Sequence, residues 1–176
     1  MLEEPEAVLT AWFDLPHKDE RDDEAVKSNL GPYYRQARRG TFRDWTRTEK
    51  GRLALIILFD QVPRHLFRDQ PEQYTTDERA QQLASHFFQE GFPDAFTPEE
   101  TFFAALPYLH AEDLEKQKTV NPLMHQCASS IEKLSFMADV ADNYLKTIKR
   151  FGRFPHRNEI LGRESTDEEE AWLKDS

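Results

Sequence analysis

The sequence contains a single cysteine, Cys127, among its 176 residues. One cysteine excludes an intrachain disulfide and a zinc site built from several thiolates. Such sparse cysteine is typical of a reducing compartment, so we expect a cytoplasmic protein. Residues 1–6 have neither the basic stretch nor the apolar stretch of a signal peptide, and we expect none there.

Long apolar runs and positive charge are also scarce. The longest apolar run, residues 53–59, is too short to span a membrane. The formal net charge of −10 disfavours general binding to nucleic acid or to an anionic membrane, and we expect neither as a partner. A local basic patch remains compatible with a small anionic ligand.

Aromatic residues are abundant, with 13 Phe, 5 Tyr and 3 Trp to supply a core. Hydrophobic residues make up 38% of the chain, so the composition does not predict disorder. The length predicts a single domain over residues 1–176.

Helical signals follow one another along the chain, and no hairpin signal for strands is present. By periodicity, the run 53–59 fits either a buried strand or a buried helix. We interpret it as part of a helix over residues 47–61, because the pattern exceeds strand length and only Ile56 and Ile57 are β-branched. The predicted fold class is all-α, with about eight helices joined by short turns.

Prolines, glycines and capping boxes set the expected helix boundaries. Leu15-Pro16 is expected to end a helix over 3–13, Gly31-Pro32 to separate helices over 18–29 and 33–39, and Pro63 and Pro107 to end two more. Capping boxes at 75–78 and 97–100 predict helix starts, the first for a helix that ends at Gly91. Further helices are expected over 112–120, from Asn121-Pro122 onward, over 130–150, and after a cap at 165–169.

The first candidate cluster is Asp60-Gln61-Val62-Pro63-Arg64-His65. We expect Asp60 at the C-terminal end of a buried helix, where the helix dipole disfavours a negative charge. Its carboxylate therefore needs a partner, and Arg64 is close in sequence. The cluster is either an acid beside an anion-binding arginine or a structural ion pair that locks the turn.

The second cluster is His110, Glu112 and Asp113, three potential metal ligands within four residues. Neighbouring side chains at a helix start diverge, and no His-x-x-x-His spacing is present. We therefore expect no metal and no cofactor, and helix capping is the simpler interpretation.

The third cluster is the segment 151–163, which carries Arg153, His156, Arg157, Asn158 and Arg163. Pro155 suits the first position of a short helix that Gly162 ends. Arginine in a first turn opposes the helix dipole, and free amide N–H groups there favour an anion. That anion is either a ligand or an internal carboxylate of Asp60, Glu112 or Asp113.

Three motifs together resemble one family: Asp60-Gln61-Val62-Pro63-Arg64, then His110-Ala111-Glu112-Asp113 with Gln117, then Arg150-Phe151-Gly152-Arg153-Phe154-Pro155-His156-Arg157-Asn158 with Leu161-Gly162-Arg163-Glu164-Ser165-Thr166. Their order is similar to that of a widespread, mainly bacterial family named domain of unknown function nine hundred and twenty-four. The resemblance extends from Val8 to Leu173. It implies a tetratricopeptide-like array of antiparallel helices and implies no reaction.

We therefore predict an all-helical binding protein with a polar site for a small anionic ligand or an acidic peptide terminus. The predicted site residues are Asp60, Arg64, His110, Glu112, Asp113, Arg153, His156, Arg157, Asn158 and Arg163. One alternative is a hydrolase in which His110 or His156 works with an acid partner. Another is a protein-interaction scaffold with an exposed apolar groove. No nucleophile elbow, phosphate-binding glycine loop or dinucleotide fingerprint is present.

Overall fold

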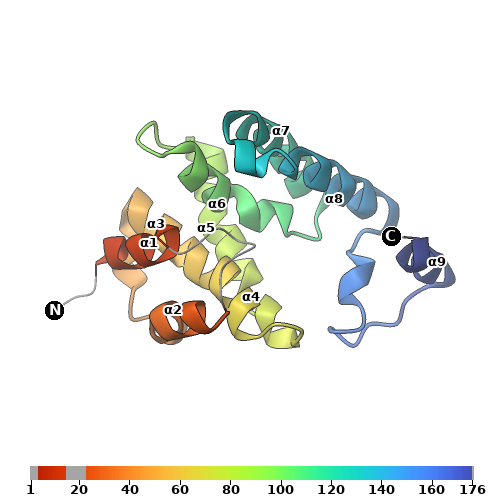
Figure 1. Cartoon of the computed structure of the whole chain (residues 1–176), viewed down its shortest axis with the longest axis horizontal. Coiled ribbons are helices and arrows are strands. Elements are labelled where there is room, and N and C mark those ends of the chain that lie inside the picture. The colour runs from red at the N-terminus through yellow and green to blue at the C-terminus, as the bar shows by residue number, and fades with distance from the viewer. Residues whose placement is uncertain (1–3, 15–22, 176) are drawn as a thin grey trace. The chain divides into compact units, whose positions relative to one another are not determined.

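The computed structural model describes residues 4–14 and 23–175, which form helices and turns with no β-strand among them (Figure 1). The predicted all-α class with about eight helices is confirmed. By its internal contacts the chain divides into two compact units, Met1–Pro107 (unit 1) and Tyr108–Ser176 (unit 2). The single domain over residues 1–176 stays a prediction. None of the described helices is long and apolar enough to cross a membrane.

Unit 1 is built around the apolar run 53–59, in which every residue is buried. Each buried Leu or Ile of this run contributes about 2 kcal/mol to folding by leaving water. Helices α1 and α5 and the segment η1 pack on α3, and α2 packs on α4. The elements are α1 (Pro5–Phe13), α2 (Asp23–Arg38), the 3₁₀ segment η1 (Arg43–Arg47), α3 (Glu49–Ile56), the π-helical segment η2 (Ile57–Gln61), α4 (Val62–Leu66), the 3₁₀ segment η3 (Pro71–Tyr74) and α5 (Asp77–Glu90); α6 (Pro98–Leu109) begins in unit 1 and ends in unit 2.

The most buried helix does not end at Pro63, so that prediction is wrong. Pro63 has no N–H to donate to the carbonyl of Phe59, four residues earlier. The backbone widens into η2, where the N–H of Val62 donates to the carbonyl of Ile57, five residues earlier. The Phe59 carbonyl accepts a hydrogen bond from the hydroxyl of Thr76 at 2.6 Å instead. The chain therefore stays helical through α4.

Three other prolines lie inside helices that the sequence had divided. Helix α2 is continuous through Gly31-Pro32, α6 through Pro107, and α7 (Leu114–Ser130) through Pro122. Pro32 and Ser28, whose carbonyl loses its donor, are both exposed, so water can replace the missing hydrogen bond. The boundary predicted at Leu15-Pro16 and the first residues of the helix predicted over 18–29 lie outside the described residues.

The two predicted capping boxes have different outcomes. At the start of α6, the Thr97 N–H donates to Glu100 Oε2 at 2.9 Å and the Glu100 N–H donates to Thr97 Oγ1 at 3.1 Å, which confirms that box. Helix α5 starts where the box at 75–78 predicts, but Thr76 makes no side-chain cap. The Thr76 hydroxyl instead donates to the carbonyl of Phe59, a contact that no local sequence pattern predicts.

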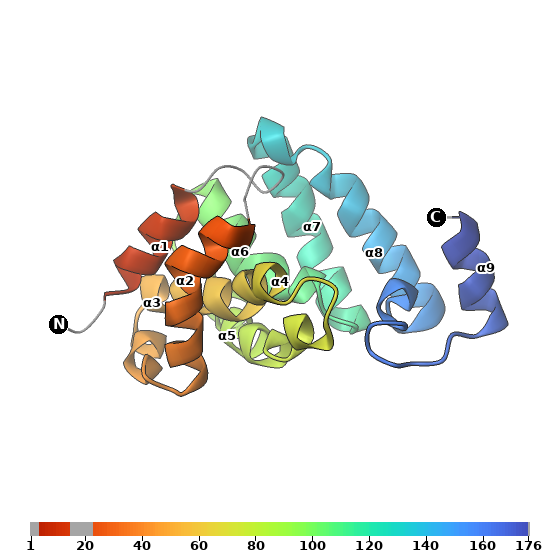
Figure 2. The ribbon, with the colours of Figure 1, turned by 60° about the horizontal axis from the view of Figure 1, so that its bottom comes forward.

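Unit 2 is built on α7 and α8 (Met137–Phe151), which lie side by side (Figure 2). Helix α8 begins at Met137 rather than Ser130, because Ile131 is extended and the 3₁₀ segment η4 (Glu132–Leu134) intervenes. It ends at Gly152, whose φ of 70° suits a glycine after a helix. The remaining elements are the 3₁₀ segment η5 (Pro155–Arg157) and α9 (Asp167–Asp175).

Replacement of Thr76 by valine tests its hydrogen bond to Phe59. Thr76→Val keeps the side-chain shape but leaves the buried Phe59 carbonyl without its donor, so we expect the free energy of unfolding to fall by about 1–3 kcal/mol. Urea denaturation followed by circular dichroism measures the change. Thr75→Val is the matched control at an exposed neighbour and should change the free energy by less than about 0.5 kcal/mol. Equal losses in the two variants contradict the role given to Thr76.

Candidate functional site

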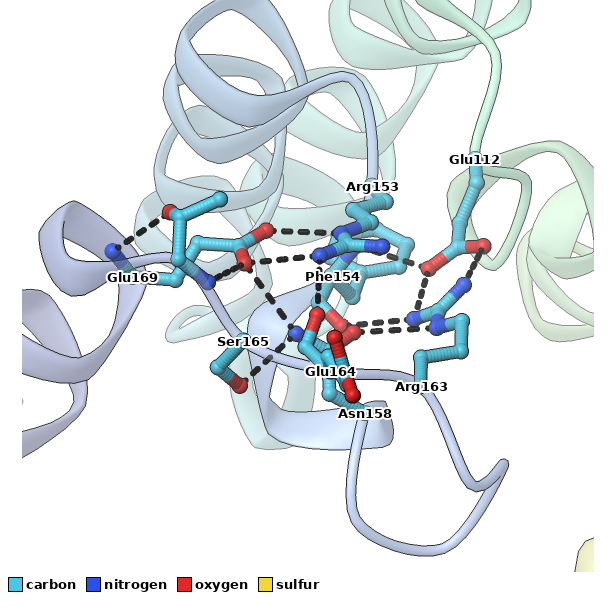
Figure 3. Close-up of polar contacts among 9 residues, drawn as sticks. Glu112, Arg153, Phe154, Asn158, Arg163, Glu164, Ser165 and Glu169 are labelled. Atoms are coloured by element: carbon cyan, nitrogen blue, oxygen red, sulfur yellow. Dashed lines mark hydrogen bonds and ion pairs between the residues drawn. The ribbon is translucent and has the colours of Figure 1, made fainter.

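In unit 2, a bidentate ion pair between Glu112 and Arg163 holds the loop that follows α8 (Figure 3). Arg163 donates from Nη1 to Glu112 Oε2 at 2.7 Å and from Nη2 to Glu112 Oε1 at 2.9 Å. The backbone N–H of Phe154 also donates to Glu112 Oε1, at 2.7 Å. Burial acts to raise the pKa of Glu112, but Arg163 and the Phe154 N–H outweigh it and lower the pKa. The carboxylate is therefore held in its charged form.

A second carboxylate, Glu169 of α9, binds Arg153. Arg153 donates from Nε to Glu169 Oε1 at 2.7 Å and from Nη2 to Glu169 Oε2 at 2.8 Å. The Thr166 N–H donates to Glu169 Oε2 at 2.8 Å and the Glu169 N–H donates to Thr166 Oγ1 at 3.2 Å, which confirms the predicted cap at 165–169. Hydrogen bonds from Arg153 lower the pKa of Glu169 from its usual 4.5 to about 2.

Asn158 joins the two ion pairs. Its Oδ1 accepts from Arg163 Nε at 2.9 Å, and its Nδ2 donates to Ser165 Oγ at 3.0 Å and to Glu169 Oε2 at 3.3 Å. Figure 3 shows the result as one connected set of contacts from Glu112 to Glu169, which we call the Glu112–Glu169 network. The network fixes the loop 152–166 at both ends.

Arg157 and His156 lie beside this network. The Arg157 guanidinium is 4.6 Å from the ring centre of Phe154, and its Nη2 donates to the carbonyl of His110 at 3.0 Å. The ring of His156 lies 5.4 Å from that of Phe154 and 6.4 Å from that of Tyr144. Loss of hydration and the charge of Arg157 lower the pKa of His156. The short helix predicted between Pro155 and Gly162 is the 3₁₀ turn η5 followed by turns.

The side chains around Glu112 have structural partners as well. Asp113 caps α7, with its Oδ1 accepting from the Lys116 N–H at 3.0 Å. The buried Gln117 donates from Nε2 to the carbonyls of Leu109 and Ala111, at 2.6 and 3.0 Å, and so fixes the turn that carries Glu112. In residues 4–14 and 23–175, no three or more His, Cys, Asp or Glu side chains are grouped as metal ligands.

In unit 1, Asp60 and Arg64 meet a third residue, Asp77. Asp60 is 0% exposed and accepts from the Gln61 amide, while its Oδ1 lies 3.3 Å from Arg64 Nη1. Arg64 also donates to both carboxylate oxygens of Asp77 at 3.0 Å. Burial acts to lower the pKa of Arg64, but the charges of Asp60 and Asp77 outweigh it and raise the pKa. Because the helix continues to Leu66, Asp60 does not lie at a helix end as predicted.

Two histidines form hydrogen bonds with carboxylates and were not predicted as site residues. His65 Nδ1 of α4 lies 2.9 Å from Asp23 Oδ1 of α2, and His125 Nε2 of α7 lies 2.9 Å from Asp142 Oδ1 of α8. Arg68 also donates to both carboxylate oxygens of Asp23. Each pair ties one helix to another within its own unit.

The predicted site residues thus fall into both compact units. Unit 2 brings together Glu112, Arg153, Arg157, Asn158 and Arg163 with the backbone of His110, and unit 1 holds Asp60 and Arg64. Sequence reasoning missed the partners Glu169 and Asp77. For Glu169 and Asp77 the sequence indicated only a nearby helix start, and it did not indicate which arginine each binds.

A pocket of about 330 Å³ lies in unit 1, and we call it the basic pocket because its charged lining residues are Arg43 and Arg79. Its lining is Ala37, Gly40, Phe42, Arg43, Thr46, Leu55, Phe59, Arg79, Gln82 and Leu83. The Arg79 guanidinium lies 4.2 Å from the ring centre of Phe59. Among the residues that the structure describes, neither Arg43 nor Arg79 forms an ion pair with a carboxylate.

The backbone that carries Arg43 is fixed on both sides. Gly40, with φ of 83°, ends α2 with the two hydrogen bonds of a Schellman motif. Gly51 of α3 lies so close to η1 that an added Cβ would come within 2.1 Å of the Trp45 carbonyl oxygen. The Trp45 ring stacks on Phe42 at 4.1 Å. Arg43 therefore projects from a segment whose backbone is held by contacts within unit 1.

The net negative charge of the whole chain hides a local excess of positive charge in the segment that carries Arg43. Residues 35–52 carry seven Lys or Arg against two Asp or Glu, whereas the rest of the chain carries 16 against 31. A second pocket, of about 630 Å³, shares Phe42, but the carboxylates of Glu4, Glu6, Asp44 and Glu49 line it. The second pocket is therefore unsuited to an anion.

The fold and its polar networks define a small all-α protein with paired internal charges and a basic pocket. The chain belongs to the family described as bacterial protein of unknown function (DUF924), whose model matches residues 3–176, so the resemblance seen in the sequence is confirmed. The solved structure of a protein of unknown function, ATU0120 from Agrobacterium tumefaciens, is similar to it. That protein is 29% identical, the match covers 98% of this chain and 97% of that one, and the TM-score is 0.80. Comparison with curated proteins gives no significant match.

Glu169→Gln tests the Glu112–Glu169 network through its pH dependence. Because the folded pKa of Glu169 is depressed to about 2, its stabilisation is present above its usual 4.5 and is lost as the pH falls from there towards 2. We expect Glu169→Gln to lower the thermal midpoint at pH 7 and to flatten its fall between pH 4.5 and 2.

The matched control is Glu168→Gln, one residue away. Glu168 pairs with Arg150 at 2.7 Å, but both side chains are more than half exposed, so the midpoint should hardly change. Thermal unfolding followed by circular dichroism at several pH values measures both variants. The same acid response in Glu169→Gln as in the wild type contradicts the role of this carboxylate.

Proposed function

We propose that the protein binds a small anionic ligand in the basic pocket of unit 1. The observation that carries the proposal is that Arg43 and Arg79 line one pocket of about 330 Å³ without carboxylate partners in the described part of the chain. Arginine is favoured for such a task because its planar fork matches the oxygens of a carboxylate or a phosphate. The local excess of positive charge over residues 35–52 draws an anion to this surface.

The arginines of the predicted clusters are less suited to a ligand. Arg163 already donates from both terminal nitrogens to Glu112, and Arg153 donates from Nε and Nη2 to Glu169. An incoming anion has to displace a carboxylate that the fold holds in place. At Arg43 and Arg79 an anion meets no such carboxylate among the described residues.

The lining of the basic pocket favours binding over hydrolysis. Its residues, as described by the structure, include no His, Cys, Asp, Glu, Lys or Tyr to act as an acid–base or nucleophilic group. The volume is near the lower end for ligand pockets, which suits a small molecule better than an acidic peptide. A scaffold role has less support, because the large exposed hydrophobic side chains among the described residues are Phe136, in the turn before α8, and Leu173, on α9.

Arg79→Gln and Arg43→Gln test the proposal with pyrophosphate as the probe. Loss of one charge-assisted hydrogen-bonding group costs about 1.5–3 kcal/mol, so we expect roughly a ten- to hundredfold weaker affinity in each variant. Isothermal titration calorimetry in low salt measures it. Both side chains are exposed, so circular dichroism should show that the variants stay folded.

Arg39→Gln is the control, because Arg39 belongs to the same basic segment, is exposed and does not line the pocket. It should bind pyrophosphate almost as the wild type does. An equal loss in all three variants indicates binding to diffuse surface charge and overturns the pocket. The pocket is also overturned by a second result. In this result a short oligonucleotide binds the wild type more tightly than pyrophosphate does, and Arg39→Gln weakens oligonucleotide binding as much as Arg43→Gln and Arg79→Gln do.

A further inference from the structure

We propose that the ligand of the basic pocket is a phosphate monoester with a small apolar body, such as a single ring. The inference rests on the proposed anion binding and names the chemistry of both ends of the ligand. It depends on three properties of the pocket: the burial of its lining, its volume and its number of cations.

The lining residues separate by burial into two groups. The apolar residues Ala37, Phe42, Leu55 and Phe59 are buried, and Leu83 is half-buried. The charged and amide side chains of Arg43, Arg79 and Gln82 are exposed. The charged and amide groups therefore lie on the solvent side of the lining, and the apolar groups lie on its core side. A ligand that fits this order places an apolar group inside and its anionic group at the mouth, where the arginines remain hydrated until it arrives.

The volume is too large for a bare anion. Water occupies about 30 Å³ per molecule, so a pocket of about 330 Å³ has room for roughly ten water-sized groups. A phosphate group alone leaves much of that space unfilled. An ester-linked ring fills more of it and removes apolar surface from water, which stabilises the complex.

The number of cations selects between a phosphate and a carboxylate. A phosphate monoester carries about −1.5 to −2 charges at pH 7 and three terminal oxygens, enough to engage two guanidinium groups. A carboxylate has one charge and two oxygens, which a single arginine fork satisfies. Two arginines that line one pocket without a carboxylate partner among the described residues therefore match a dianion better. The ring of Phe59 holds the Arg79 guanidinium in position, which lowers the cost of ordering it.

Titration of the full chain with phenyl phosphate, inorganic phosphate and benzoate tests the inference. We expect phenyl phosphate to bind at least tenfold more tightly than either of the others. In Arg43→Gln and Arg79→Gln all affinities should fall, and phenyl phosphate should lose most of its advantage over benzoate. Leu83→Asn makes the wall more polar, and should reduce the preference for phenyl phosphate over inorganic phosphate.

The outcomes separate this inference from the proposed function. Equal affinity for phenyl phosphate and inorganic phosphate overturns the apolar body but leaves anion binding in place. Equal affinity for phenyl phosphate and benzoate overturns the requirement for a dianion. Binding of none of the probes, or binding that neither arginine variant weakens, overturns the inference and the proposed function together. If Leu83→Asn fails to fold, Leu83→Ala is a second variant for the wall. It should reduce the preference for phenyl phosphate over inorganic phosphate.

Discussion

The nitrogen of Pro63 carries no hydrogen, and much of unit 1 depends on how the chain replaces that missing donor. The carbonyl of Phe59 is buried, so leaving it unpaired costs about 1–3 kcal/mol. The hydroxyl of Thr76 pairs with it, which draws the start of α5 onto η2. This contact places Asp77 beside Arg64 and Arg79 over the ring of Phe59. A local backbone defect in the core thus determines both a buried ion pair and the position of one arginine of the basic pocket.

In unit 2 the loop 152–166 is held by polar contacts as well as by the buried side chain of Phe154. Two carboxylates supply most of these polar contacts. Glu112 binds Arg163 and the Phe154 N–H, and Glu169 binds Arg153 while it also caps α9. Such pairs cost desolvation, and their net contribution to stability is small compared with the loss when one partner is removed. Their main effect is to allow one arrangement of the loop, since each guanidinium finds its two oxygens in one place.

The sequence predicted those features that depend on near neighbours and missed those that depend on distant ones. The amphipathic spacing predicted the all-α class, and Thr97 with Glu100 predicted a capping box that the structure confirms. The helix end expected at Pro63 is not observed. Thr76, thirteen residues later, donates to the Phe59 carbonyl the hydrogen bond that Pro63 cannot donate. In the candidate clusters, the residue types indicated ion pairs but not their partners. Arg163 could not be assigned to Glu112 from spacing, since 51 residues separate them.

Arg43 and Arg79 differ from the ion-paired arginines in the residues that surround them. In a chain with 33 acidic and 23 basic residues, a carboxylate is the expected neighbour of every cation. The carboxylate nearest to Arg43 in sequence, Asp44, lies 3.1 Å from Arg47 on the exposed surface and lines the other pocket. Among the described residues, Arg43 and Arg79 therefore line one pocket without a carboxylate partner. The anion proposed for this pocket therefore competes with no carboxylate of the described residues for Arg43 and Arg79.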